Sequence, residues 1–221
     1  MILMVYMFVC HLMHILGSIF MAHIVKLVPN DFKSVPWKNN RGFTKELVID
    51  PPNASVSGVF CWRLSMASVI ESAPFSNLVG IDRTILILDG NGIELDHGSN
   101  GKSLLKTILS PVTFQGEWDT YGKLLNGPCV DFNVMTERKR VSHIVSVIYP
   151  KLGSLFLPKA DTVLVFCVKG SAYAVCSDVV IKAGELLRAD LQQADSVINL
   201  DVTVNNTILI IVLLTFMIDV Y

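Results

Sequence analysis

Two runs between residues 61 and 95 decide the fold: Cys61-Trp-Arg-Leu-Ser-Met-Ala67 and Thr84-Ile-Leu-Ile-Leu-Asp-Gly-Asn-Gly-Ile-Glu-Leu95. In the first run, large apolar residues alternate with small or polar ones. An extended strand therefore places Trp62, Leu64 and Met66 on one face and Arg63 and Ser65 on the other. One face can enter a core, and the opposite face carries a charge and a hydroxyl.

The second run is apolar as far as Leu88 and then contains Asp89-Gly-Asn-Gly92. Glycine, asparagine and aspartate tolerate positive φ, so this tetrapeptide predicts the turn of a β-hairpin that returns through Ile93–Leu95. Together the two runs predict antiparallel β structure.

The rest of the chain repeats short apolar runs separated by turn residues, and no segment has a long helical period. In the run from residue 43 to 49, Thr44, Glu46 and Val48 are expected to share one face. Short helices within residues 102–107 or 118–125 are left open. The other expected strands are residues 24–28, 130–135, 141–149, 162–168, 172–176 and 208–218. The sequence therefore predicts an all-β fold.

Charge and cysteine content limit the classes of partner. The formal net charge is −1, and the densest basic run is Arg138-Lys-Arg140, so we expect no nucleic-acid partner. The five cysteines are widely spaced without a Cys-x-x-Cys pair, which favours reduced thiols and a cytoplasmic location. Cys167 and Cys176 could face each other across a hairpin, but two buried thiols is the preferred interpretation.

Residues 1–20 carry no charge and are apolar enough to cross a bilayer. They lack the basic flank and the small-x-small site of a signal peptide. The preferred interpretation is that Met21 is the natural start and that residues 1–20 come from an upstream start codon. The alternative is an uncleaved anchor, and only in that case is a membrane expected as a partner.

Three ordered blocks resemble the HutD/Ves family, small bacterial proteins associated with histidine utilisation. The first is Pro36-Trp-Lys-Asn39 with Thr44-Lys-Glu46, and the second is Trp62–Ala67 with Pro74–Ser76 and Gly80–Arg83. The third is Gly127-Pro128 with Asp131-Phe-Asn-Val-Met135. The sequence departs from the family pattern at Asn40-Arg41, where glycines are usual, and at Ala73.

The resemblance implies a bicupin, that is, two small β-barrel domains in one chain. We expect residues 1–20 to be an apolar extension, residues 21–138 to form an N-terminal cupin barrel and residues 139–221 to form a C-terminal cupin barrel. Charges cluster near residues 136–140, where the linker is expected.

Three strands carry polar pairs at positions i and i+2: Thr44/Glu46, Arg63/Ser65 and Asp131/Asn133. Both members of such a pair lie on the same side of a strand, so three such strands could point six polar groups into one lumen. Alternatively, each pair faces water, as in many half-exposed strands. The resemblance favours the lumen, because its blocks contain these pairs. The candidate ligand-binding residues are Trp37, Asn39, Thr44, Glu46, Arg63, Ser65, Ser76, Arg83, Asp131 and Asn133.

Arg63 and Arg83 are the candidate anion ligands, because guanidinium binds carboxylate through two parallel hydrogen bonds. Either could instead pair with Glu46, Asp82 or Asp131. The His-x-His set of metal-binding cupins is missing, and the histidines at 23, 97 and 143 lie on separate segments, with His97 in a polar loop. We therefore expect no metal, no cofactor and no catalytic residue.

The function expected from these observations is non-catalytic binding of a small anionic metabolite in the N-terminal barrel, with a regulatory role. The family's association with histidine breakdown suggests formylglutamate or another intermediate of that pathway. One alternative is a metal-independent isomerase or hydrolase acting on a similar acid, with Glu46 or Asp131 as general base. Another is a membrane-anchored structural protein that uses residues 1–20. A homodimer is left open.

Overall fold

The computed structural model describes residues 22–37, 42–55, 58–191 and 197–217. Apart from two short 3-10 helices, Pro29–Asp31 and Gly98–Asn100, all regular elements are strands, which confirms the all-β prediction. Within these ranges, no helix is long and apolar enough to span a membrane. The apolar extension of residues 1–20, Asn39 and the Asn40-Arg41 departure lie outside the described residues.

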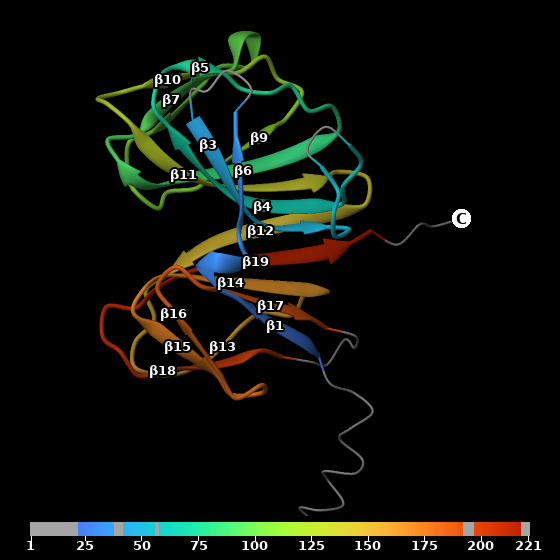
Figure 1. The fold of residues 1–221 in the computed structure, drawn as a ribbon, viewed down its shortest axis with the longest axis vertical. Coiled ribbons are helices and arrows are strands. Elements are labelled where there is room, and N and C mark those ends of the chain that lie inside the picture. Colours follow the sequence, from blue (N-terminus) through green and yellow to red (C-terminus); the bar gives the residue numbers. More distant parts are fainter. Residues whose placement is uncertain (1–21, 38–41, 56–57, 192–196, 218–221) are drawn as a thin grey trace, which may run out of the picture.

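The strands form four antiparallel sheets (Figure 1). The six-stranded sheet has the order β2 (Lys33–Pro36), β3 (Gly42–Asp50), β4 (Trp62–Val69), β11 (Cys129–Glu137), β6 (Ile81–Gly90) and β9 (Val112–Gln115). The first four-stranded sheet has the order β5 (Ala73–Pro74), β10 (Tyr121–Leu124), β7 (Ile93–Asp96) and β8 (Lys102–Leu105).

The second half of the chain, together with β1, supplies the other two sheets. The five-stranded sheet has the order β1 (His23–Leu27), β17 (Leu186–Asp190), β14 (Thr162–Lys169), β19 (Ile208–Phe216) and β12 (Val141–Ile148). The second four-stranded sheet has the order β13 (Gly153–Phe156), β18 (Asn199–Val202), β15 (Ser171–Ala174) and β16 (Val179–Lys182). No sheet in the described ranges closes into a barrel, so the sheets do not confirm the two-barrel arrangement.

The six-stranded and five-stranded sheets pack face to face in the middle of the molecule (Figure 1). Their shared core joins Trp62, Leu64 and Phe132 of the first sheet to Leu164 and Val212 of the second. Each outer face of this pair contacts one four-stranded sheet through a separate apolar cluster. The strand β1 joins the five-stranded sheet through β17, although it lies at the start of the described chain.

The predicted alternation on β4 and β11 is confirmed. Trp62 and Leu64 lie in the core between the two large sheets, whereas Arg63 and Ser65 point to the opposite face. On β11, Phe132 enters the same core, and Asp131, Asn133 and Met135 line the other face. Because successive side chains of a strand point to opposite faces, the core-facing apolar residues direct the polar residues outward.

The predicted faces of β3 are wrong after Glu46. A β-bulge between Glu46 and Val48 shifts the register against β4, so that Val48 pairs with Leu64 and Ile49 pairs with Arg63. Val48 therefore packs toward the core between the large sheets, whereas the pattern placed it beside Thr44 and Glu46. The extra residue of a bulge reverses the alternation of every residue that follows it.

The predicted hairpin at residues 89–92 is also wrong. The strands β6 and β7 do not pair with each other; β6 pairs with β11 and β9, and β7 pairs with β10 and β8. The chain instead passes between two sheets at Gly90-Asn-Gly92. Both glycines have positive φ, as expected, and both lie too close to neighbouring backbone for a side chain.

Gly92→Ala is expected to lower the free energy of unfolding by about 1–3 kcal/mol more than Gly101→Ala. Both positions have positive φ, but a Cβ at Gly92 would lie 2.1 Å from the carbonyl oxygen of Leu105, whereas a Cβ at Gly101 meets nothing within 4 Å. Urea denaturation of the two variants measures the difference. Equal destabilisation would show that the close approach to Leu105 imposes no constraint.

Two alternatives left open by the sequence are now decided. The segments considered as short helices contain the strands β8 and β10, and of the two thiols expected to be buried, only Cys167 is. Cys167 and Cys176 do not face each other across a hairpin, because β14 and β15 belong to different sheets, and Cys176 is exposed while Cys167 is buried. The division into domains at residue 138 stays a prediction.

Candidate functional site

The polar pairs predicted from the sequence meet on one face of the six-stranded sheet, the face turned away from the five-stranded sheet. Strand register places them in rows that cross the sheet. One row contains Ile49, Arg63, Met135 and Arg83, each paired with the next across a strand boundary. The next two rows are Glu46–Ser65–Asn133 and Thr44–Ala67–Asp131.

Apart from Ile49, the residues of these rows form the floor of a cavity of about 750 Å³. Strand β2, residues 54–55 and the segment from residue 73 to 78 complete its lining. Every predicted ligand-binding residue within the described ranges lines it: Trp37, Thr44, Glu46, Arg63, Ser65, Ser76, Arg83, Asp131 and Asn133. The structure thus brings these side chains together, and their role in binding stays a prediction. Asn39 lies outside the described residues.

Arg63 forms an ion pair with Glu46 inside the cavity. Its Nε donates to Oε2 of Glu46 at 2.8 Å, and its Nη1 donates to Oγ of Ser65 at 3.2 Å. Only 6% of the Arg63 side chain and 12% of the Glu46 side chain are exposed. One of the internal pairings considered for this arginine is therefore present, and Glu46 offsets much of its charge.

Arg83 lies between two aromatic rings. Its guanidinium carbon is 5.0 Å from the ring centre of Phe75 and 5.1 Å from that of Phe114, which β9 places opposite Arg83 in register. The residue is 4% exposed, and its Nε has no hydrogen-bond partner among the described residues. Burial lowers the pKa of Arg83 to about 10, an effect that Asp131 opposes and Arg63 reinforces.

Asp131 and Asn133 are buried side by side on β11, and the Oδ1 atom of each lacks a hydrogen-bond partner within the described part of the chain. Burial raises the pKa of Asp131 to about 7 from an ordinary value of 3.8, although Arg83 and the backbone N–H of Ala67 favour the charged form. A carboxyl group that titrates near neutral pH therefore faces the cavity.

Asp131 is expected to make the protein less stable as the pH rises from about 4 to about 7. Its folded-state pKa is raised, so over this window the folded state binds more protons than the unfolded state. The free energy of unfolding therefore falls as the pH rises, because the folded protein must hold an ionised carboxyl group in a buried position. Relative to wild type, Asp131→Asn should gain on the order of a few kcal/mol across the window. Urea denaturation at several pH values measures this gain, with Asp89→Asn at an exposed position of β6 as the control. A constant difference between wild type and Asp131→Asn would contradict the prediction.

Trp37 and Thr44 form part of the cavity wall next to β2. The indole Nε1 of Trp37 donates to Oγ1 of Thr44 at 2.8 Å. The backbone of Gly42 passes so close to this ring that a Cβ there would lie 3.1 Å from it. Thr44 is therefore held by the tryptophan, and the indole has a fixed position at the wall.

Sequence reasoning missed the lining residues Lys33 and Phe75, and it missed Phe114, which packs on Arg83. Phe75 belongs to the Pro74–Ser76 block of the family resemblance but was not predicted to bind the ligand. An aromatic residue in the same block as an arginine could have indicated a stacking partner for that arginine. No sequence motif points to Lys33 or Phe114 as part of the site. Lys33 reaches the cavity because β2 forms part of its wall, and Phe114 reaches Arg83 because β9 pairs with β6. Asp82, considered as a partner of the candidate arginines, instead accepts from Nε of Arg138 at 2.7 Å.

No described histidine lines the cavity. His97, expected in a polar loop, is buried and hydrogen-bonds to Thr120 at 2.9 Å and Ser103 at 3.2 Å. His143 lies between Thr84 and Thr136, where β12 meets the six-stranded sheet, and burial lowers its pKa. These two histidines therefore have structural partners of their own.

Comparison with known sequences identifies related proteins. A family model described as HutD matches residues 29–210. An uncharacterised 21.2 kDa protein in the hutC 3′ region of Pseudomonas putida is 36% identical over 121 residues, which cover 54% of this chain and 62% of that protein. Protein Ves of Cronobacter sakazakii is 35% identical over 114 residues, which cover 50% of this chain and 60% of that protein. The chain thus spans less than two thirds of the length of these curated relatives.

Solved structures with a similar fold include HutD from Pseudomonas fluorescens SBW25, with a TM-score of 0.73 and 27% identity. That likeness covers 88% of this chain and 99% of the other chain. A cupin 2 conserved barrel domain protein from Leptotrichia buccalis has a TM-score of 0.51 at 12% identity, and this likeness concerns the fold alone. The all-β fold therefore has cupin-like neighbours.

Proposed function

Because the chain belongs to the HutD/Ves family, whose name associates it with histidine utilisation, we propose that it binds a small anionic metabolite in the cavity of the six-stranded sheet. One observation carries the proposal: two buried arginines, Arg63 and Arg83, share a row on the cavity floor, and Nε of Arg83 has no partner among the described residues. A buried guanidinium N–H without an acceptor favours an anion that can supply one.

The balance of charge in the cavity also supports an anion. Glu46 offsets Arg63 through the 2.8 Å ion pair, and burial raises the pKa of Asp131, which lessens its negative charge at neutral pH. The positive charge of Arg83 is thus only partly offset by its neighbours, and Lys33 adds a second positive charge at the cavity wall. In a site of low dielectric, this excess attracts a carboxylate more strongly than it would in water.

The finer features of the proposal extend the family relationship. We propose formylglutamate or another histidine-degradation intermediate as the ligand, a regulatory and non-catalytic role, and a cytoplasmic location. The cupin-like fold supports a bicupin arrangement with barrels at residues 21–138 and 139–221. A homodimer and the lack of a metal, a cofactor and a nucleic-acid partner stay predictions.

Arg63→Lys is expected to weaken binding of the carboxylate by roughly 1.5–3 kcal/mol, or about one to two orders of magnitude in Kd. Lysine keeps the charge beside Glu46 but loses the planar set of donors. Thermal shift with formylglutamate, urocanate, glutamate and histidine identifies a ligand, and calorimetry compares the Kd values. Arg140→Lys, at an exposed turn, is the matched control. If Arg63→Lys binds every ligand as tightly as wild type does, Arg63 does not contribute to ligand binding.

A metal-independent enzyme is the second candidate, and the raised pKa of Asp131 favours it. A carboxyl group with a pKa near 7 suits a general base at neutral pH, and Asp131 fits this role better than Glu46, which pairs with Arg63. Incubating the protein with each ligand found by thermal shift, followed by NMR, tests for turnover. Turnover that Asp131→Asn abolishes while the variant still binds would establish the enzyme, and unchanged ligand after prolonged incubation would support binding alone.

A further inference from the structure

The cavity floor has a donor part and an acceptor part. Arg63 and Arg83 supply donors from β4 and β6, whereas Asp131 and Asn133 supply acceptors from β11, the strand between them. A carboxylate can be bound by the donors, but it has no hydrogen to give to the acceptors. A carboxylate alone therefore satisfies only half of this floor.

One oxygen of each acceptor residue, Oδ1 of Asp131 and Oδ1 of Asn133, has no partner in the described part of the fold. Asp131 is 2% exposed and Asn133 is 5% exposed. Their cross-strand neighbours on the cavity face are Ala67 and Ile87 for Asp131, and Ser65 and Ile85 for Asn133. Of these side chains only Ser65 is polar; its Oγ accepts from Arg63, and it makes no hydrogen bond to Oδ1 of Asn133.

Such a pair favours a ligand that brings a hydrogen-bond donor into the cavity. Each buried acceptor without a donor loses the hydrogen bonds that it would make in water, and the loss is larger for a carboxylate than for an amide. The spacing of the two residues at i and i+2 places both on the same side of β11, so both oxygens face the same cavity. The raised pKa of Asp131 is consistent with a carboxyl group that lacks such a donor.

We propose that the ligand of this cavity carries an N–H donor beside its carboxylate, and that the Oδ1 atoms of Asp131 and Asn133 accept from it while Arg63 and Arg83 bind the carboxylate. This inference rests on the proposed function. According to this inference, Asp131 and Asn133 select nitrogen-bearing acids, such as amino acids or N-acyl amino acids, over plain carboxylic acids.

The test compares four probes that share one carbon skeleton. Glutamate carries an ammonium group, N-formylglutamate an amide N–H, 2-formyloxyglutarate an ester oxygen in place of that N–H, and glutarate hydrogen atoms only. Calorimetry should give wild type a Kd for at least one nitrogen-bearing probe that is roughly ten- to hundredfold lower than for the ester and glutarate. The better of the two nitrogen probes identifies the source of the donor, ammonium or amide.

Variants of Asp131 and Asn133 test whether these two residues distinguish the N–H-bearing probes from the ester. Asn133→Leu and Asp131→Leu each remove one acceptor, and each should reduce the ratio of Kd values between the ester and the N–H probe by about tenfold. Val130→Leu, on the same strand but outside the residues that line the cavity, is the matched control and should keep the full ratio. Thermal melts confirm that each variant is folded, and having two separate variants keeps the test valid if one fails to fold.

The outcomes separate this inference from the proposed function. If all four probes bind with similar Kd values and Arg63→Lys weakens them all, the anion site stands and the donor inference is overturned. An unchanged ratio in both β11 variants would also overturn it. If none of the probes or the other acids binds to wild type, the proposed function itself fails.

Discussion

Replacing Arg63 with methionine is expected to lower the free energy of unfolding by about 3–5 kcal/mol. The substitution leaves the carboxylate of Glu46, whose side chain is 12% exposed, without the guanidinium that lies 2.8 Å away. It also removes the donor from Oγ of Ser65. The loss is large because the remaining charge is held by a rigid sheet in a partly dehydrated cavity and cannot recover its water.

A double-mutant cycle with Glu46 tests this explanation. In Arg63→Met/Glu46→Leu both charges are gone, so the double variant should regain most of the stability lost in Arg63→Met. Urea denaturation of wild type, both single variants and the double variant gives the coupling free energy. If Arg63→Met loses less than about 1 kcal/mol, or if the double variant is the least stable of the four, the pair is not a buried ion pair of this kind.

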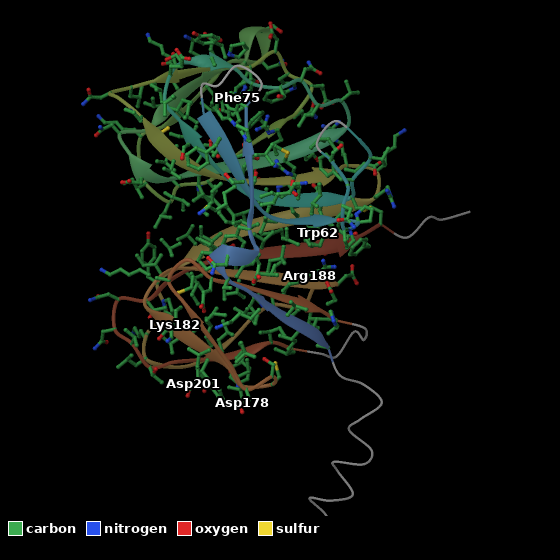
Figure 2. All side chains as sticks on the ribbon, viewed as in Figure 1. Trp62, Phe75, Asp178, Lys182, Arg188 and Asp201 are labelled. Carbon is green, nitrogen blue, oxygen red and sulfur yellow. The ribbon has the colours of Figure 1, made fainter. Side chains whose placement is uncertain are left out.

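Trp62→Ala is expected to be as damaging, at about 3–5 kcal/mol. The side chain is fully buried in the core that joins the six-stranded and five-stranded sheets, and the guanidinium of Arg188 on β17 stacks on its ring at 4.8 Å (Figure 2). Truncation therefore opens a cavity between two sheets whose strands are fixed by hydrogen bonds and cannot collapse to fill it.

Phe156→Ala is the matched control for Trp62→Ala, because it removes an aromatic ring that is 68% exposed. It should change the free energy of unfolding by no more than about 0.5 kcal/mol. Chemical denaturation of both variants, with near-ultraviolet circular dichroism to follow the aromatic environment, measures the contrast. Similar effects in the two variants would contradict the assignment of the main core to the contact between the two large sheets.

The sheet that carries the cavity is also the sheet that carries the main core. One face of β4 and β11 provides Trp62 and Phe132 to the contact with the five-stranded sheet, and the other provides Arg63 and Asp131 to the cavity. The packed face fixes the backbone, and a fixed backbone holds the cavity side chains in position, which favours selective binding.

The sequence by itself determined the β class and the face of each polar residue on β4 and β11. Both follow from local geometry, since side chains of a strand alternate whatever the strand's partners are. The alternation of Trp62 and Leu64 with Arg63 and Ser65 was therefore readable directly. The candidate residues of the cavity were found by adding the family resemblance to this alternation.

Only the tertiary structure decided which strands are neighbours and which groups meet. The bulge after Glu46 reverses the faces of β3, Gly90 and Gly92 lead from one sheet to another where a hairpin was expected, and Phe114 reaches Arg83 through β9. The ion pair between Arg63 and Glu46 and the unpartnered oxygens of Asp131 and Asn133 likewise depend on burial by distant segments. Strand pairing and desolvation are set by contacts between residues far apart in the chain, and no local pattern encodes them.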